Sequence, residues 1–411
     1  MLYFPRQDRR KLDFFMPLKQ ARANARLRCW RSLPAITAWL AGAAIALGLL
    51  AACASRPETG SLIQVDQPAA GATSHSMLVA TTRQRDARPG TYFNGERAAK
   101  LDFASIDISV PPSHQPGEIE LPASAPGNPA KDFVVRSAAY LDGDSQFTAS
   151  LNARLARQPA GKRKVLLFIH GYNTLFAEGV YRFAQIDHDA QSPAVPVLFT
   201  WASRGNVTEY VYDNNSATSA RDDLEHTLRL IFASNADQVD ILAHSLGNWV
   251  TVEALRQMKI SGNLPYAAKF GTLVLAAPDI DIDVFKSQMR RFGKPAKPFF
   301  VVLSRDDKAL AASAFFAGGK ARLGADTDTA ELTALGAVVI DLTDVKANDS
   351  SNHDKFAQLA QIAPQLRGVL EGGISAGSAS PEQKGGTTRL GALVDVPLTI
   401  LGAPVRIITG R

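Results

Sequence analysis

The sequence predicts an α/β fold with a mostly parallel central sheet and helices on both of its faces. Between residues 164 and 362, short apolar runs that suit strands alternate with segments of helical spacing. This alternation is typical of parallel sheets whose connections are helices. The run Lys164-Val165-Leu166-Leu167-Phe168-Ile169 is nearly continuously apolar, as expected for a strand that is covered on both faces.

The predicted elements follow one another in a regular order. Strands are expected at residues 77–82, 106–110, 164–169, 195–201, 239–242, 272–277, 299–303 and 337–342. Helices are expected at residues 145–158, 176–184, 220–231, 248–253, 282–291, from 308 onward and 354–362. Prolines and glycines between residues 116 and 131 predict a covering loop, and residues 203–213 are predicted to form a polar loop.

A serine lies at the centre of this pattern. Ser245 follows a strand-like run and precedes a helical pattern, within Ala243-His244-Ser245-Leu246-Gly247. The sharp turn of a nucleophile elbow excludes bulky side chains two residues before and two residues after the serine. Ala243 and Gly247 meet this requirement, although the usual first residue is glycine. Ser245 is therefore the predicted nucleophile, and His244 is interpreted as a packing neighbour beside the substrate.

A serine nucleophile needs a base, and the base needs an acid that orients it. On an elbow-type fold the three follow one another in the order serine, acid, histidine. The chain has seven histidines, and only His353 follows Ser245. Asp307 is the preferred acid because it follows the penultimate predicted strand, and Asp306 is the next candidate. Three further acids follow the strand before that one: Asp279, Asp281 and Asp283.

The anion that forms during acyl transfer needs two backbone N–H donors. An elbow fold supplies one from the residue after the serine and one from the loop after an earlier strand, which predicts Leu246 and Tyr172. Glycine in that loop lets the backbone approach a substrate carbonyl closely. The residues expected to line the substrate site are His170, Gly171, His244, Tyr210 and Tyr212.

Four blocks of the sequence resemble those of a known family. They are Phe168-Ile169-His170-Gly171-Tyr172-Asn173, Phe199-Thr200-Trp201-Ala202-Ser203-Arg204-Gly205, Ala243-His244-Ser245-Leu246-Gly247 and Ala276-Ala277-Pro278-Asp279-Ile280-Asp281. From about Met77 to Ile362 the chain resembles the α/β-hydrolase superfamily, and more narrowly the bacterial domain of unknown function 900 (DUF900) family. The resemblance implies a serine hydrolase fold and leaves the substrate open.

Residues 1–52 resemble a lipoprotein signal peptide, with Met16 as an alternative start. A basic section precedes an apolar run over residues 35–50, and Leu50-Ala51-Ala52-Cys53 resembles a lipobox. We therefore expect lipid on Cys53 and contact with a membrane through it, an uncleaved anchor being the alternative. Ala54 resembles the residue found there in lipoproteins of the outer membrane. The expected location is the bacterial cell envelope, on the outer membrane facing the periplasm.

The positive charge of the chain is concentrated in this leader. The whole chain has a net charge of +6, while residues 1–52 hold nine Lys and Arg against two Asp, a net of +7. The remainder therefore carries 6 − 7 = −1. A nucleic-acid partner is not expected, because its recognition needs basic residues in the folded part.

The segments on either side of the predicted hydrolase domain, residues 77–370, have a different composition. Residues 53–76 are rich in Pro, Gly, Ala, Ser and Thr, which predicts a flexible tether without a fixed fold. Residues 371–411 combine a Gly/Ser-rich linker with an apolar run from Leu393 to Leu401, which we expect to dock on the body as an extended segment. No metal-ligand spacing is evident, so neither a metal nor a cofactor is predicted.

The predicted function is an envelope-anchored serine hydrolase that cleaves carboxylic esters through an acyl-enzyme intermediate. Its substrate is expected to be a small-molecule or lipid ester. Two alternatives remain open: a non-catalytic binding or scaffold protein on the same fold, and a peptidase or amidase with the same triad. The sequence leaves the oligomeric state undefined.

Overall fold

The computed structural model describes most of the chain after the leader. The described residues are 56, 59–262, 267–293, 295, 297–326, 328–362, 393–394, 399–400 and 403–409. The signal peptide, Cys53 and the linker over residues 371–392 lie outside this part. Among the described residues, no helix is both long enough and apolar enough to cross a bilayer.

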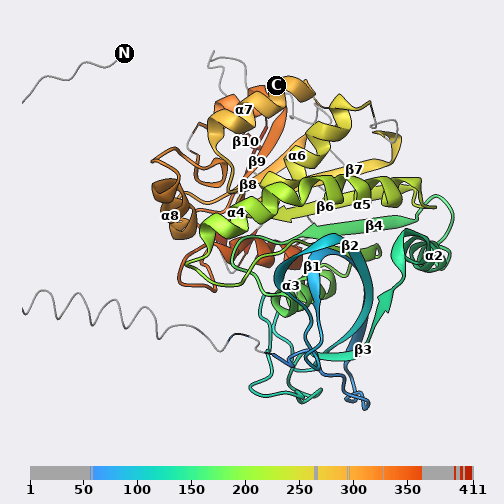
Figure 1. Ribbon diagram of the computed structural model, residues 1–411. Coiled ribbons are helices and arrows are strands. Elements are labelled where there is room, and N and C mark those ends of the chain that lie inside the picture. Colours follow the sequence, from blue (N-terminus) through green and yellow to red (C-terminus); the bar gives the residue numbers. More distant parts are fainter. Residues whose placement is uncertain are drawn as a thin grey trace, which may run out of the picture. The chain divides into compact units, whose positions relative to one another are not determined.

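The described strands form one eleven-stranded sheet in the order β10-β13-β9-β8-β7-β6-β4-β5-β1-β2-β3, with β11 and β12 as a separate pair. Figure 1 labels β1–β4 and β6–β10 of this sheet. The strands are β1 (Thr73–Asp86), β2 (Tyr92–Val110), β3 (Val134–Leu141), β4 (Lys164–Ile169), β5 (Val195–Thr200), β6 (Gln238–His244), β7 (Phe270–Ala276), β8 (Phe299–Leu303), β9 (Ala337–Asp341), β10 (Leu393–Val394), β11 (Thr399–Ile400), β12 (Ala403–Pro404) and β13 (Arg406–Ile408). From β5 to β9 all neighbours are parallel.

Helices cover both faces of the sheet, which confirms the predicted fold. They are α2 (Gly143–Leu155), α3 (Phe176–Asp189), α4 (Tyr210–Ser219), α5 (Arg221–Ala233), α6 (Gly247–Ile260), α7 (Ile282–Phe292), α8 (Lys308–Phe316) and α9 (Thr329–Ala334), with the 3₁₀ segments η1 (Ala267–Lys269), η2 (Leu323–Ala325) and η3 (Asp354–Ile362). One buried apolar cluster joins the sheet to α2, α5, α6 and α7, and a second joins it to α3 and η3. The strands between them are therefore buried on both faces, as the continuous apolar run of β4 predicts.

The N-terminal strands begin earlier than expected. The prediction of an unstructured tether over residues 53–76 is wrong from Leu62 onward, because Leu62 is fully buried and β1 begins at Thr73. Leu62 donates its N–H to Gly90 O at 2.9 Å, and Gln64 bridges to Val135. Buried Leu62 and the hydrogen bonds that join Ser61 and Val65 to the body thus fix this segment.

Two further predictions are corrected. Tyr210-Val211-Tyr212-Asp213, expected in a polar loop, forms the first turn of α4. Residues 207–219 contain neither proline nor glycine, and burial of Asp213 and Ala217 outweighs the weak helix preference of their polar neighbours. Strand β3 was not predicted, and its exposed and buried residues do not alternate strictly.

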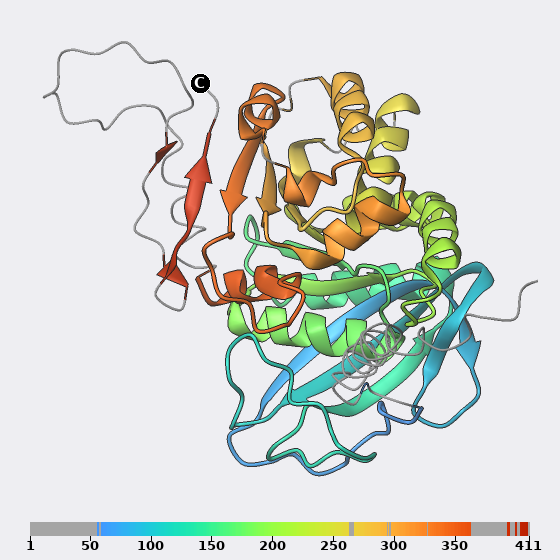
Figure 2. The same ribbon diagram turned by 90° about the vertical axis from the view of Figure 1, so that its left-hand side faces the viewer.

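The C-terminal tail completes the sheet at its far edge. β13 pairs antiparallel with β9, and β10 pairs antiparallel with β13. Figure 2 shows β13, in red, beside the orange strands of the body. Within the apolar segment after Leu393, which was expected to dock on the body, β10 pairs with β13, and it is β13, further along the chain, that pairs with β9 of the body.

Candidate active site

The candidate site lies where the order of the strands changes direction. The chain passes from β4 outward to β5, and then to β6 on the other side of β4. The carboxyl ends of β4 and β6 therefore open at a switch point of the sheet, where α/β folds bind their ligands. His170 follows β4 directly, and Ser245 follows β6.

Ser245 has the backbone conformation of a nucleophile elbow. Its φ angle is 54°, a left-handed value that is uncommon for a residue with a side chain. Its N–H donates to Ala276 O at 2.9 Å, and its carbonyl accepts from Asn248 Nδ2 at 2.9 Å and from the Asp279 N–H at 3.1 Å. These bonds hold the turn in a conformation that local preference alone would not select.

Two glycines allow the loop after β4 to approach the serine. A Cβ atom on Gly171 would lie 2.6 Å from Ser245 Cβ, and one on Gly247 would lie 2.4 Å from His170 O. Neither distance is possible for a real side chain, so both positions require glycine. The backbone at Gly171 therefore lies against the serine, and Leu246 is the N-cap of α6. Helix N-termini leave N–H groups without intrahelical acceptors, which suits the predicted anion-binding role of Leu246.

The structure brings the predicted base and acid together. His353 Nδ1 lies 2.7 Å from Asp307 Oδ2, and the Asp307 side chain is fully buried. The His353 ring lies 4.7 Å, centroid to centroid, from that of His244, the residue before Ser245. The loop after β9 thus places His353 beside the elbow.

The two neighbouring aspartates have different partners. Asp307 is the N-cap of α8, where its Oδ1 accepts from the Leu310 N–H at 2.9 Å and its Oδ2 faces His353. The Asp306 side chain is 41% exposed, and Lys355 Nζ donates to its Oδ1 at 2.7 Å and its Oδ2 at 2.9 Å. Asp307 is therefore the carboxylate placed to orient His353.

Opposing influences act on the protonation of His353. Burial lowers its pKa, but the hydrogen bond and the charge of Asp307 raise it, and the net pKa lies above the usual value. Burial and then the charge of His353 hold the pKa of His244 well below its usual range. His244 stacks on Phe356 with ring centroids 4.0 Å apart, so it is a neutral packing neighbour of the site.

A buried arginine supports the loop after β4, and the sequence analysis missed it. Arg83 of β1 donates at 2.7 Å to each of three acceptors: Thr174 O, Thr200 Oγ1 and Ser203 O. Burial lowers the pKa of Arg83 to about 10, so the guanidinium stays charged at neutral pH. A charged residue at the end of an apolar strand was the one signal of this role in the sequence.

His170 lies under this loop and does not face outward. Its Nε2 lies 2.8 Å from Thr200 Oγ1, its Nδ1 lies 2.8 Å from Gly171 O, and its ring stacks on Trp201. Burial, followed by the charge of Arg83, holds its pKa well below the usual range. The structure therefore does not support the expected contact between His170 and substrate, because both ring nitrogens already have partners within the protein.

Tyr210 and Tyr212 lie in different surroundings, although both were expected to line the site. The Tyr210 ring lies 5.2 Å from that of Tyr172 and 6.3 Å from that of Phe316. The ring of Tyr212 instead packs under Arg204, and its hydroxyl donates to Gly95 O at 3.2 Å. Residues two apart on a helix do not share a face, so only Tyr210 belongs with the site.

Exposed apolar side chains gather beside Tyr210. Phe315 and Phe316 of α8 are 79% and 71% exposed, and Val211 of α4 is 73% exposed. The Tyr210 hydroxyl connects the two helices through a 2.9 Å hydrogen bond with Ser313. We call Tyr210, Phe315 and Phe316, whose rings follow one another in contact, the apolar rim.

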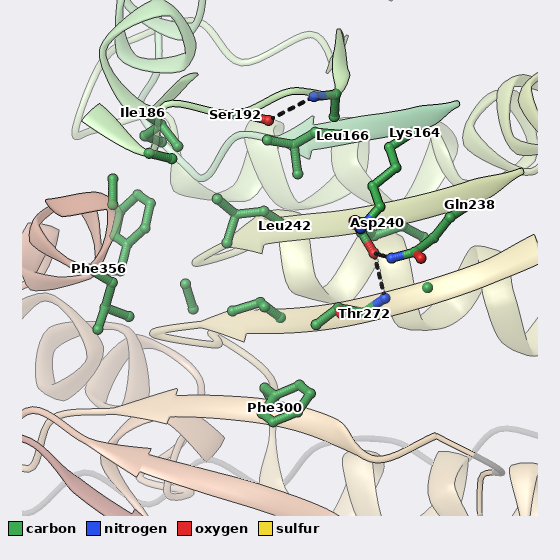
Figure 3. Close-up of a pocket in the computed structure, with 18 of the residues that line it drawn as sticks. Lys164, Leu166, Ile186, Ser192, Gln238, Asp240, Leu242, Thr272, Phe300 and Phe356 are labelled. Atoms are coloured by element: carbon green, nitrogen blue, oxygen red, sulfur yellow. Dashed lines mark hydrogen bonds between the residues drawn. The ribbon is translucent and has the colours of Figure 1, made fainter. Parts of the chain in front are cut away.

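A separate cavity of about 570 Å³ crosses the face of the sheet between α3 and η3. In Figure 3, Leu166, Leu242 and Phe300 lie along it, with Phe356 at one end and Lys164 at the other. Ser245, His353 and Asp307 do not line it. Phe356 connects the cavity to the site through its stacking on His244, but the cavity is not the space over the serine.

One comparison with known proteins gave a match. A family model described as "Alpha/beta hydrolase of unknown function (DUF900)" matches residues 144–369, which is 226 of the 411 residues. Searches of curated proteins and of solved structures found no match. The matched range contains Ser245, Asp307 and His353, and it excludes Arg83.

Proposed function

Since the chain belongs to the DUF900 family of alpha/beta hydrolases, we propose that it is a serine hydrolase that cleaves carboxylic esters through Ser245, His353 and Asp307. The observation that carries this proposal is the Asp307–His353 hydrogen bond beside a serine with a left-handed backbone. Fold alone would not suffice, because one fold hosts many functions. A buried carboxylate held against a histidine at the switch point is a specific arrangement for acyl transfer.

The proposed reaction begins with proton transfer from Ser245. Asp307 accepts a hydrogen bond from the Nδ1–H of His353, which leaves Nε2 as the acceptor for the serine proton. The serine oxygen attacks the ester carbonyl, and the backbone N–H groups of Tyr172 and Leu246 stabilise the resulting anion. His353 then gives the proton to the leaving alkoxide. A water molecule, activated by the same histidine, hydrolyses the acyl-enzyme.

The apolar rim supports an ester with an apolar acyl group as the substrate class. Phe315 and Phe316 expose large surfaces that water disfavours, and such patches commonly mark binding sites. A substrate whose acyl group is an alkyl or lipid chain fits this surface.

A panel of esters graded by acyl length tests this proposal. We expect turnover by the wild type to rise with acyl length, and the Ser245→Ala variant to be inactive on all of them. Phe316→Ser should reduce kcat/KM for long esters more than for acetate esters. Wild-type turnover no greater than that of Ser245→Ala would favour a binding or scaffold protein, and preferential cleavage of peptides would favour a peptidase.

We also propose that lipid on Cys53 anchors the mature chain to the bacterial envelope. The basic and apolar sections before Leu50-Ala51-Ala52-Cys53 support this proposal. Labelled fatty acid should enter the wild type and not the Cys53→Ser variant, which should lose its membrane association. Equal incorporation in the two would refute the anchor without affecting the proposed chemistry.

A further inference from the structure

A second cluster of histidines and carboxylates lies at the C-terminal end of α3. His114 lies in the loop after β2, while His188 and Asp189 are the last two residues of α3. One potential ligand atom from each of the three lies within 4.8 Å of the others. Among the described residues, this is the one group of His, Cys, Asp or Glu side chains that meets this criterion. We propose that His114, His188 and Asp189 bind a divalent transition-metal ion of the Zn²⁺ type.

The side chains of His114, His188 and Asp189 already contact one another. His114 Nε2 lies 2.9 Å from Asp189 Oδ1, and the rings of His114 and His188 are nearly perpendicular with centroids 5.1 Å apart. In a tetrahedral zinc site with bonds of about 2.0–2.1 Å, neighbouring ligand atoms lie about 3.4 Å apart. The ligand atoms of the three residues lie at most 4.8 Å apart, so each pair would have to approach by at most about 1.4 Å to reach this separation. Small rotations of the side chains can provide that movement.

His114 and Asp189 each have a second polar atom that contacts the surrounding protein. His114 Nδ1 lies 2.8 Å from Glu120 Oε2. Asp189 Oδ2 accepts from the Gly117 N–H at 2.7 Å and from Gln185 Nε2 at 2.6 Å. Metal-binding histidines and carboxylates are usually oriented by such partners, which fix the ring and raise its basicity.

The third ligand has a comparable support. His188 Nδ1 lies 3.0 Å from Nε2 of His75, whose own Nδ1 lies 2.7 Å from Asp187 Oδ2. The cluster therefore joins β1, the loop after β2 and the end of α3. Each of the three ligands has a further partner in the protein, and one potential ligand atom of each lies within 4.8 Å of the others.

Charge and ligand type favour a cation of this class. The side chains of His114 and Asp189 are only 5% and 2% exposed, so water screens them little. The C-terminal end of a helix carries a partial negative charge, which adds to that of Asp189. Two imidazoles and one carboxylate suit Zn²⁺ and related ions, whereas Mg²⁺ and Ca²⁺ prefer oxygen ligands.

The site is expected to stabilise the fold and not to take part in catalysis. α3 has 14 residues and is therefore about 20 Å long. Its first turn follows the loop beside Ser245, whereas the cluster is at its other end. Metal binding should raise the midpoint of thermal unfolding in proportion to log[Zn²⁺] and leave ester turnover unchanged.

The test uses the untagged full-length chain after chelation, titrated with Zn²⁺ alone. One equivalent should bind, and His114→Gln or Asp189→Asn should weaken binding at least a hundredfold. Glu120→Gln, which removes only an outer partner, should weaken binding about ten- to a hundredfold. His226→Gln is the matched control, because His226 pairs with Asp144 outside the cluster. A Cys29→Ser/Cys53→Ser variant should bind as the wild type does, since thiols play no part.

Co²⁺ provides a second readout that does not require the variants to fold. The wild-type chain should show the d–d bands of a low-coordinate site without charge transfer from a thiolate. Failure to bind one equivalent of Zn²⁺, or equal affinity in the wild type and in a folded Asp189→Asn variant, would overturn the proposal. A thiolate band that disappears in the cysteine variant would also overturn it.

Discussion

Ser245 lies between two loops that the protein supports in different ways. On one side, the loops after β8 and β9 supply Asp307 and His353, whose direct 2.7 Å contact involves two ionisable groups. On the other side, the loop after β4 presents only backbone beside the serine, and a buried arginine from another strand supports it. We call these the relay side and the anion side.

The two sides differ in where the residues that position them lie in the sequence. The relay side lies within the matched residues 144–369, and one side chain, Asp307, both caps α8 and orients the histidine. The anion side depends on Arg83, which lies outside that range in β1. The N-terminal strands are therefore part of the proposed catalytic unit. The following predictions test the two sides separately.

The largest effect is expected from loss of the serine or of the histidine. Ser245→Ala and His353→Ala should each reduce ester turnover on the order of a millionfold, because the residues of a triad act as one unit. The double variant should be no worse than either single variant, which steady-state kinetics with a long-chain ester would show. Losses that multiply in the double variant would mean that the two residues do not share a mechanism.

The next largest effect separates the two neighbouring aspartates. Asp307→Asn should reduce turnover about ten-thousandfold, because the amide favours the wrong tautomer of His353. Asp306→Asn is the matched control and should change turnover less than about tenfold, since Asp306 faces Lys355. If Asp306→Asn proves the more damaging change, the relay side is assigned to the wrong carboxylate.

On the anion side, the most damaging single change is expected at Gly171. A methyl group there would meet Ser245 Cβ at 2.6 Å, so Gly171→Ala must displace the loop and its N–H donors. Turnover should fall about a hundredfold or more, the scale of a lost oxyanion donor. Gly179→Ala in α3 is the control, because its Cβ would meet no atom closer than 3.6 Å. Equal turnover in the two variants would place the anion site elsewhere.

A smaller effect is expected from substitution of Arg83, which supports the loop after β4. Arg83→Lys keeps the charge but cannot reach all three acceptors, and buried acceptors without donors cost about 1–3 kcal/mol each. Both the melting temperature and kcat should fall, with kcat reduced about tenfold and KM changed less. Arg85→Lys on the same strand should have little effect, because its ion pair with Asp102 is partly exposed. If the two lysine variants behave alike, the anion side does not depend on Arg83.

The smallest expected effect is a shift in the pH dependence of kcat/KM when Asp307 is replaced by Asn. His353 acts as a base only when neutral, and its pKa lies above the usual value. The acid limb of kcat/KM should therefore lie above about pH 6.5, the usual pKa of histidine. In the residual activity of Asp307→Asn the limb should move to lower pH, because the groups that raise the pKa are weakened. If the acid limb of the pH profile does not move in Asp307→Asn, a group other than His353 controls it.

Chain order explains why most of the relay side could be predicted. One elbow serine, one later histidine and acids after an intervening strand leave few choices. The choice of Asp307 over Asp306 needs the structure, because a helix cap turns one carboxylate inward and a lysine holds the other near the surface. Neither of these two contacts can be inferred from the order of residues along the chain.

The anion side was harder to predict because its contacts are distant along the chain. Arg83 meets Thr200 and Ser203 more than a hundred residues away, and a charged residue at the end of an apolar strand does not indicate which residues it contacts. Tyr212 was misplaced for a local reason, since a helix, and not a loop, turns it away from Tyr210. His114 and His188 are likewise separated by 74 positions, too far for a ligand motif to be recognised.

Reaction with a fluorophosphonate tests the central claim most directly. The reagent phosphonylates serine oxygens that a neighbouring base has activated, and mass spectrometry of the digested protein locates the adduct. The account predicts one adduct, on Ser245, with labelling slowed at least a thousandfold in His353→Ala and unaffected in His226→Gln. No adduct on the folded wild type, or equally fast labelling of Ser245 in His353→Ala, would contradict it.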